Sequence, residues 1–312
     1  MSWQLKVLRV FLRRVAKRGL RRYADSVVAR RWFDRGALLN ARGRPDRSFI
    51  ADRLMGPDRN VDALWTAAPQ GDDPIVLYFH GGGYIMGSPR THAALARYIG
   101  RKSEAVVCLP AYRLAPEHPF PAAFEDAVLV WEALMARGIH PSQIVLGGDS
   151  AGGGLALALL GHLCAHDRPR PAGLFAFSPF TDLTYQSPSL VENAGRDILL
   201  PPQRLQRLSQ RILQGGDPAD PRISPFFASF HGAPPVFIQA ARTEILRDDA
   251  LRMADRLRAF DVDVRCDIWG NLPHVWQFFH GWLPEARAAL REVAGFIRAR
   301  RQSVPLEGPI SR

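Results

Sequence analysis

The chain has 312 residues, of which 47% are hydrophobic and 23% charged, a composition typical of a globular protein with a sizeable core. No apolar run is long enough to span a membrane, which argues against an integral membrane protein. Three widely spaced cysteines in apolar sequence favour neither a disulfide framework nor a metal site. They predict a reducing compartment, so we expect a cytoplasmic location.

The formal net charge of +11 is concentrated near the N-terminus. Ten Lys and Arg residues precede Trp32 against a single acid, Asp25, and the remainder of the chain is close to neutral. A nucleic-acid groove would need its positive charge on the folded body. This distribution therefore favours a surface-associating arm or lid and argues against a nucleic-acid partner.

Residues 1–45 form this basic arm, and its first segment has the pattern of an amphipathic helix. The apolar residues Leu5, Leu8, Leu12 and Val15 recur at helical spacing, with basic residues largely on other faces. We expect the helix to lie on its own protein as part of a cap. Two alternatives are peripheral contact with a membrane surface and a targeting segment.

After the arm, two extended runs at residues 48–55 and 61–66 flank a turn-rich connection and predict a β-hairpin. Apolar runs then alternate with helical segments. The runs are 75–79, 105–109, 144–146, 174–177, 236–238 and 262–268; the helical segments are 93–101, 121–137, 151–165, 248–260 and 284–300. Strands buried on both faces and alternating with helices predict an α/β fold with a mostly parallel sheet.

Residues 185–225 break this alternation. They are rich in Pro, Ser and other polar residues, with one helical segment near 203–213 and no convincing strand. We expect an insertion that forms a helical cap with the N-terminal arm, beside a core at 46–184 and 226–302. Residues 303–312 are predicted to be a loose tail. The sequence is compatible with a homodimer.

The turn at residues 148–152, Gly-Asp-Ser-Ala-Gly, lies between a predicted strand and a predicted helix. This G-x-S-x-G pattern puts Ser150 on a sharp corner, where Gly148 and Gly152 give the helix clearance over the strand end. Backbone N–H groups at the start of that helix can stabilise a developing anion. Asp149 is expected to support the turn rather than react.

A serine hydroxyl is a weak nucleophile near neutral pH, so Ser150 needs a general base and an acid that orients it. His274 follows the last predicted strand, at the sheet edge where Ser150 also lies. The acid should follow the strand at 236–238, where three carboxylates compete. Glu244 comes soonest after the strand and is preferred over Asp248. We expect Asp248 and Asp249 to cap a helix.

Residues 80–83, His-Gly-Gly-Gly, directly follow the strand at 75–79. Consecutive glycines leave backbone N–H groups uncovered. Together with the N–H of Ala151, those of Gly82 and Gly83 could bind the oxyanion of a tetrahedral intermediate.

The motifs at 80–83 and 148–153 together resemble the hormone-sensitive-lipase-like (bacterial family IV) branch of the α/β-hydrolases. The segments at 112–123 and 178–183 are similar to that family as well, and the resemblance runs from about residue 75 to residue 280. It implies an α/β-hydrolase fold with a helical cap.

The resemblance also implies site residues: Ser150 as nucleophile, His274 as base, and Gly82, Gly83 and Ala151 as oxyanion donors. The family usually has Asp-Pro-Leu-x-Asp after its seventh core strand, and the first Asp is the triad acid. Here residues 244–248 read Glu-Ile-Leu-Arg-Asp, so Glu244 replaces that Asp. Asp248 would then support the loop.

The expected activity is that of a serine carboxylesterase acting on small-molecule esters with short to medium acyl chains, without a metal or organic cofactor. One alternative is a hydrolase of lactones, amides or activated carbamates, for which the same residues serve. Another is a ligand receptor without catalysis, similar to the plant gibberellin receptor. That receptor has lost its catalytic histidine, whereas this chain retains His274.

Overall fold

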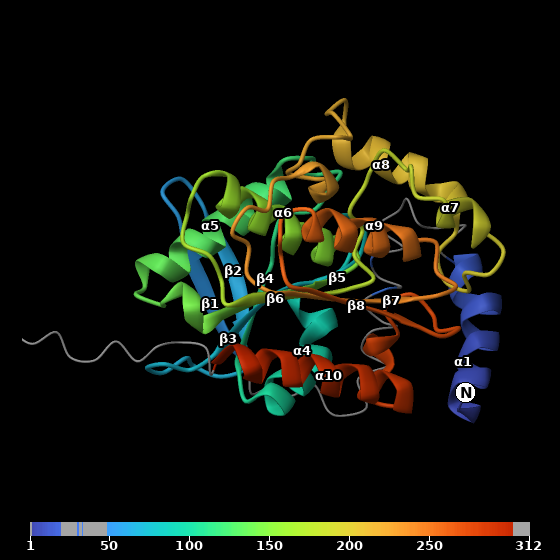
Figure 1. Ribbon diagram of the computed structural model, residues 1–312, viewed down its shortest axis with the longest axis horizontal. Coiled ribbons are helices and arrows are strands. Elements are labelled where there is room, and N and C mark those ends of the chain that lie inside the picture. The colour runs from blue at the N-terminus through green and yellow to red at the C-terminus, as the bar shows by residue number, and fades with distance from the viewer. Residues whose placement is uncertain (1, 20–29, 31–32, 34–48, 302–312) are drawn as a thin grey trace, which may run out of the picture.

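The computed structural model describes residues 2–19, 30, 33 and 49–301. Their centre is an eight-stranded sheet in the order β1-β2-β4-β3-β5-β6-β7-β8, with helices on both faces (Figure 1). The predicted tail at 303–312 and the second half of the predicted arm fall outside the described residues. Within them, no helix has both the length and the apolar character needed to cross a bilayer.

The sheet combines an antiparallel hairpin with a parallel body. β1 (Ile50–Met55) and β2 (Asn60–Trp65) pair antiparallel, and β2 then pairs antiparallel with β4. The other strands run parallel: β3 (Ile75–Phe79), β4 (Val106–Pro110), β5 (Ile144–Asp149), β6 (Gly173–Phe177), β7 (Val236–Ala241) and β8 (Val264–Trp269). The mostly parallel α/β sheet predicted from the sequence is confirmed.

The continuous apolar runs are explained by helices on both faces of the sheet. Along β3, Leu77 and Phe79 belong to the core on one face, and Val76 and Tyr78 to the core on the other. α5 (Ala122–Ala136), α6 (Ala151–Ala165) and α9 (Arg247–Arg258) cover the first face; α4 (Pro89–Ser103) and α10 (Pro284–Arg301) cover the second (Figure 1).

Residues 185–225 lie beyond the α6 and α9 side of the sheet and contain α7 (Ser189–Glu192) and α8 (Leu205–Leu213), without a strand (Figure 1). α7, a single turn, was not predicted. Ile212 and Leu213 of α8 are buried in the core of that face. This segment is called the insertion below.

α1 (Trp3–Phe11) lies beside the β7 and β8 end of the sheet and continues as a π-helical turn at Leu12–Ala16 (Figure 1). It lies on its own protein, since Leu5, Leu8 and Leu12 are buried in a cluster with Trp276. Lys17 donates hydrogen bonds to the carbonyl oxygens of residues 194 and 197 in the insertion. That the arm and the insertion act together as a cap stays a prediction.

Candidate active site

Ser150 occupies a strained turn between β5 and α6. Its backbone has φ 52° and ψ −122°, a conformation that L-residues rarely adopt. A Cβ added at Gly148 would lie 2.4 Å from the carbonyl oxygen of Gly152, and one at Gly152 would lie 2.1 Å from that of Phe79. Only glycine fits at both positions, so the close crossing of α6 over the strand ends fixes where Ser150 stands.

The glycine loop after β3 is tied to this turn by Asp149. The Gly81 N–H donates to Asp149 Oδ1 at 3.0 Å, and the same oxygen accepts the Tyr78 hydroxyl at 2.8 Å. Gly82 and Gly83 have φ of 127° and 61°. Within the described part of the chain, the N–H groups of these two glycines have no protein partner. They can therefore donate to a bound ligand.

Asp149 is buried, and burial would raise the pKa of its carboxyl group. His92 and the Tyr78 hydroxyl outweigh that effect and lower the pKa, so the carboxylate stays ionised. His92 Nε2 lies 3.3 Å from Asp149 Oδ1. Neither Tyr78 nor His92 was predicted to belong to the site, because neither lies in a motif. Their contacts agree with the expectation that Asp149 supports the turn.

His274 and Glu244 form a buried pair. His274 Nδ1 lies 2.6 Å from Glu244 Oε2, and the two residues are 5% and 1% exposed. The other carboxylate oxygen, Oε1, accepts the N–H of Ala241 at 2.6 Å, which fixes the carboxylate plane. Burial alone would lower the pKa of His274, but the hydrogen bond and the charge of Glu244 raise it above the usual histidine value.

Both carboxylate oxygens of Asp248 bind groups other than His274. Its Oδ2 accepts the N–H of Ser189 in the insertion at 2.7 Å, and Arg247 donates to its Oδ1 at 2.6 Å. Asp249 accepts the N–H of Thr181 at 2.9 Å and the Ser187 hydroxyl at 2.5 Å. Burial raises the pKa of Asp249 to about 6.

The prediction that Asp248 and Asp249 cap a helix is wrong. The residue at the cap position of α9 is Leu246, which makes no side-chain bond to the helix, and the two aspartates lie in the first turn. Their oxygens bind donors of segment 181–189 instead. The physical reason is that this segment crosses the start of α9 and brings backbone N–H groups that need buried acceptors.

The loops that carry Ser150 and His274 meet at the end of β6. The Ser150 N–H donates to the carbonyl oxygen of Phe177 at 2.8 Å. The next residue, Ser178, accepts through Oγ the N–H of Val275 at 3.3 Å. Two adjacent residues thus hold the serine turn and the histidine loop at one sheet edge, beside the unpartnered N–H groups of the glycine loop.

The insertion also braces the loop that carries Glu244. The buried Asn193 amide donates to the carbonyl oxygens of Arg242, at 3.1 Å, and Glu244, at 2.9 Å. Asp197 Oδ2 accepts the N–H of Ile245 at 2.9 Å. No sequence motif marks Asn193 or Asp197, which lie in a polar stretch beside Glu192 and Arg196.

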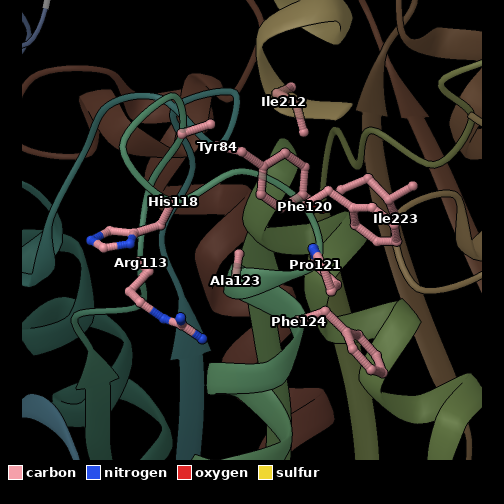
Figure 2. Close-up of a pocket in the computed structure, with 10 residues that line it drawn as sticks. Tyr84, Arg113, His118, Phe120, Pro121, Ala123, Phe124, Ile212 and Ile223 are labelled. Atoms are coloured by element: carbon pink, nitrogen blue, oxygen red, sulfur yellow. The ribbon is translucent and has the colours of Figure 1, made fainter. Parts of the chain in front are cut away.

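An apolar pocket lies between the start of α5, the end of α8 and the residue after the glycine loop, Tyr84 (Figure 2). Phe120, Phe124 and Ile212 are among its lining residues. Nearby on α8, a Leu208 methyl group lies 3.2 Å from where a Cβ on Gly83 would stand. The insertion therefore covers the glycine loop with apolar side chains.

A family model described as the alpha/beta hydrolase fold matches residues 76–278. The chain belongs to this family. The matched range of this hydrolase includes all predicted site residues: Gly82, Gly83, Ser150, Ala151, Glu244, Asp248 and His274. The hydrogen bonds described above therefore all lie in, or connect to, the part of the chain that the family shares.

Relatives of this hydrolase are named as esterases or acetyl-hydrolases. An acetyl-hydrolase of Streptomyces hygroscopicus is 38% identical over 236 residues, which cover 76% of this chain and 79% of that protein. An esterase of Acinetobacter venetianus is 37% identical, covering 71% and 74%. A carboxylesterase/phospholipase of Mycobacterium tuberculosis is 33% identical, covering 82% and 70%.

Similar solved structures are also those of esterases. An esterase from the bacterial hormone-sensitive lipase family superposes with a TM-score of 0.86 at 34% identity, covering 96% of this chain and 99% of that one. An esterase/lipase from an uncultured bacterium gives 0.86 at 33% identity, covering 97% and 100%. The chain thus belongs to the hormone-sensitive-lipase-like branch, as its motifs predicted, and is a carboxylic ester hydrolase.

Proposed function

We propose that this hydrolase cleaves esters through a Ser150-His274-Glu244 triad and an acyl-enzyme intermediate. The observation that carries the proposal is the buried hydrogen bond of 2.6 Å between His274 Nδ1 and Glu244 Oε2. It fixes the tautomer of His274 with the proton on Nδ1, so that Nε2 is the acceptor for a serine proton. The strained turn presents Ser150 at the same sheet edge.

The reaction begins with attack of Ser150 Oγ on the ester carbonyl while its proton passes to His274 Nε2. The N–H groups of Gly82, Gly83 and Ala151 stabilise the oxyanion of the tetrahedral intermediate. As the intermediate collapses, His274 gives the proton to the leaving alkoxide. A water molecule then attacks the acyl-enzyme, with His274 as base again, and the carboxylic acid leaves.

Glu244 is the proposed acid because its carboxylate stabilises the imidazolium that forms in each step. A glutamate is longer than the usual aspartate by one methylene, and the bond from the Ala241 N–H to its second oxygen holds that longer side chain in one orientation. Asp248 is a poorer candidate, since its oxygens are bound to Ser189 and Arg247.

The proposed substrates are esters with short to medium acyl chains. The support is the apolar cover that Leu208 of the insertion places over Gly83, beside the small apolar hollow lined by Tyr84 and Ile212 (Figure 2). An apolar wall next to the oxyanion donors favours an alkyl chain. The acetyl-hydrolase among the relatives is consistent with short chains.

A chain-length series of p-nitrophenyl esters, from acetate to decanoate, tests the proposal with the Ser150→Ala variant. The Ser150 side chain makes no capping bond to α6, so alanine should leave the fold intact. We expect kcat to fall by about 10⁵-fold or more, with the thermal midpoint unchanged. The matched control is Ser142→Ala, at a half-buried serine before β5 whose hydroxyl contacts His140 and no predicted site residue; it should keep full activity.

A fluorophosphonate should add its mass to the wild type and to Ser142→Ala but not to Ser150→Ala. Retention of more than a few per cent of activity by Ser150→Ala would refute this nucleophile. A rate that keeps rising up to decanoate would refute the short-chain limit alone.

A further inference from the structure

α1 has two apolar faces, only one of which is packed on the protein. Leu5, Leu8 and Leu12 are buried. On the opposite side four large apolar residues face outward at helical spacing, and we call them the outer face: Trp3, Val7, Val10 and Phe11, exposed by 65%, 52%, 52% and 54%. Apolar side chains gain free energy when they leave water, so an exposed apolar stripe of this length indicates a partner.

The outer face is held in a fixed orientation. The backbone N–H and the hydroxyl of Ser2 each donate at 2.9 Å to the carboxylate of Glu285 on α10. Arg9 donates to the carbonyl oxygen of Asn271 at 2.6 Å. The Trp3 ring meets the edge of the Trp282 ring, with centroids 6.1 Å apart. These contacts anchor α1 along its length, so the apolar stripe belongs to the folded surface.

Positive charge surrounds the outer face. Residues 3–19 contain six Lys and Arg residues and no acid. Of these, Lys6, Arg13, Arg14 and Arg18 are exposed. An apolar stripe with basic residues along it and aromatic rings within it is the pattern of a helix that lies in a lipid interface.

We propose that the outer face of α1 docks this enzyme onto an anionic lipid surface. Trp3, Val7, Val10 and Phe11 enter the boundary between headgroups and acyl chains, while the basic residues contact the negatively charged headgroups. A second copy of the chain is a poorer occupant, because a two-fold interface would bring the same basic residues together. The proposal concerns the surface to which the enzyme binds, and it does not depend on which serine or acid is catalytic.

The experiment is sedimentation of the full chain with vesicles of phosphatidylcholine containing 30% phosphatidylglycerol, compared with pure phosphatidylcholine. We expect at least tenfold stronger binding to the anionic vesicles, reduced at least fivefold by 0.5 M NaCl because screening weakens the headgroup attraction. The double variant Val7→Asp, Phe11→Asp should bind at least tenfold more weakly.

The matched control is Ala67→Asp, Ala68→Asp, which adds two carboxylates at exposed positions after β2 and should bind vesicles like the wild type. Hydrolysis of soluble p-nitrophenyl acetate should be unchanged in both double variants, which shows that they fold. Equal binding of wild type and Val7→Asp, Phe11→Asp would overturn the proposal. So would light scattering that shows a dimer which this variant alone loses, since the outer face would then bind a second copy.

Discussion

The two sides of the candidate active site are positioned by different means. The Ser150 side is fixed by main chain: glycines 148 and 152 permit a close crossing, and the Ser150 N–H bonds to Phe177 at the end of β6. The Glu244 side is fixed by side chains of the insertion, namely Asn193 and Asp197, which bind the backbone of residues 242–245.

This difference indicates that the insertion has two roles in the structure. Leu208 covers the glycine loop, and Ile212 lines the apolar hollow beside Tyr84. Earlier in the insertion, Asn193 and Asp197 hold the loop of the proposed acid. A change in the insertion can therefore alter both the cover of the glycine loop and the geometry of the His274-Glu244 pair. A change around Ser150 acts on the serine turn and, through Asp149, on the glycine loop.

The largest expected effect is a difference in kcat between variants of two carboxylates near the start of α9, Glu244 and Asp248. Glu244→Gln should lower kcat by about 10²–10⁴-fold, because a neutral amide no longer stabilises the imidazolium. Asp248→Asn keeps an oxygen for the Ser189 N–H and should change kcat by less than about threefold. Steady-state kinetics with p-nitrophenyl butyrate measures both. A larger loss in Asp248→Asn would show that the acid has been assigned to the wrong residue.

The next effect is on pH dependence. His274 acts as a base only when neutral, and Glu244 raises its pKa above the ordinary value of 6.5. Activity should therefore rise with pH through a midpoint above 6.5. In Glu244→Gln the charge is lost, so the pKa falls and the midpoint should move to lower pH. The measurement is kcat/KM against pH, which reports the free enzyme; an unshifted midpoint in the variant would contradict the pairing.

The smallest effect tests whether the insertion positions the acid. Asn193→Ala leaves the buried carbonyl oxygen of Glu244 and the part-buried one of Arg242 without this donor and should cost about 1–3 kcal/mol of stability. We expect kcat to fall severalfold with KM little changed, because the loop of Glu244 loosens while the pocket remains. Urea unfolding and steady-state kinetics measure the two effects.

Ser224→Ala is the matched control for this variant. The buried Ser224 hydroxyl also makes two hydrogen bonds, with Leu183 and Pro218, but none to the acid loop. It should lose comparable stability with kcat unchanged. If both variants lose the same fraction of kcat, Asn193 contributes stability only and does not position Glu244.

Most of the fold could be predicted from the sequence because its signals are local. The strand at 75–79 and the helix at 151–165 have the predicted bounds, since apolar runs and a small-residue helix leave few alternatives. The main errors in secondary structure were the short helix α7, too brief for a periodic pattern, and strands such as β7 that continue three residues further. Gly148 and Gly152 were correctly expected to give clearance for a close crossing.

The sequence by itself determined the α/β sheet, the serine turn, the glycine loop and the family, because each is carried by residues adjacent in the chain. The partners of Asp248 and Asp249 depended on the tertiary structure. Asp249 binds Thr181 and Asp248 binds Ser189, 68 and 59 positions away, and no local pattern encodes such pairs. The tertiary structure also decided where the buried face of α1 ends: Leu5, Leu8 and Leu12 are buried as predicted, whereas Val15, expected on the same face, is exposed in the π-helical turn. Both faces are apolar, and packing covers only the one with Leu5, Leu8 and Leu12.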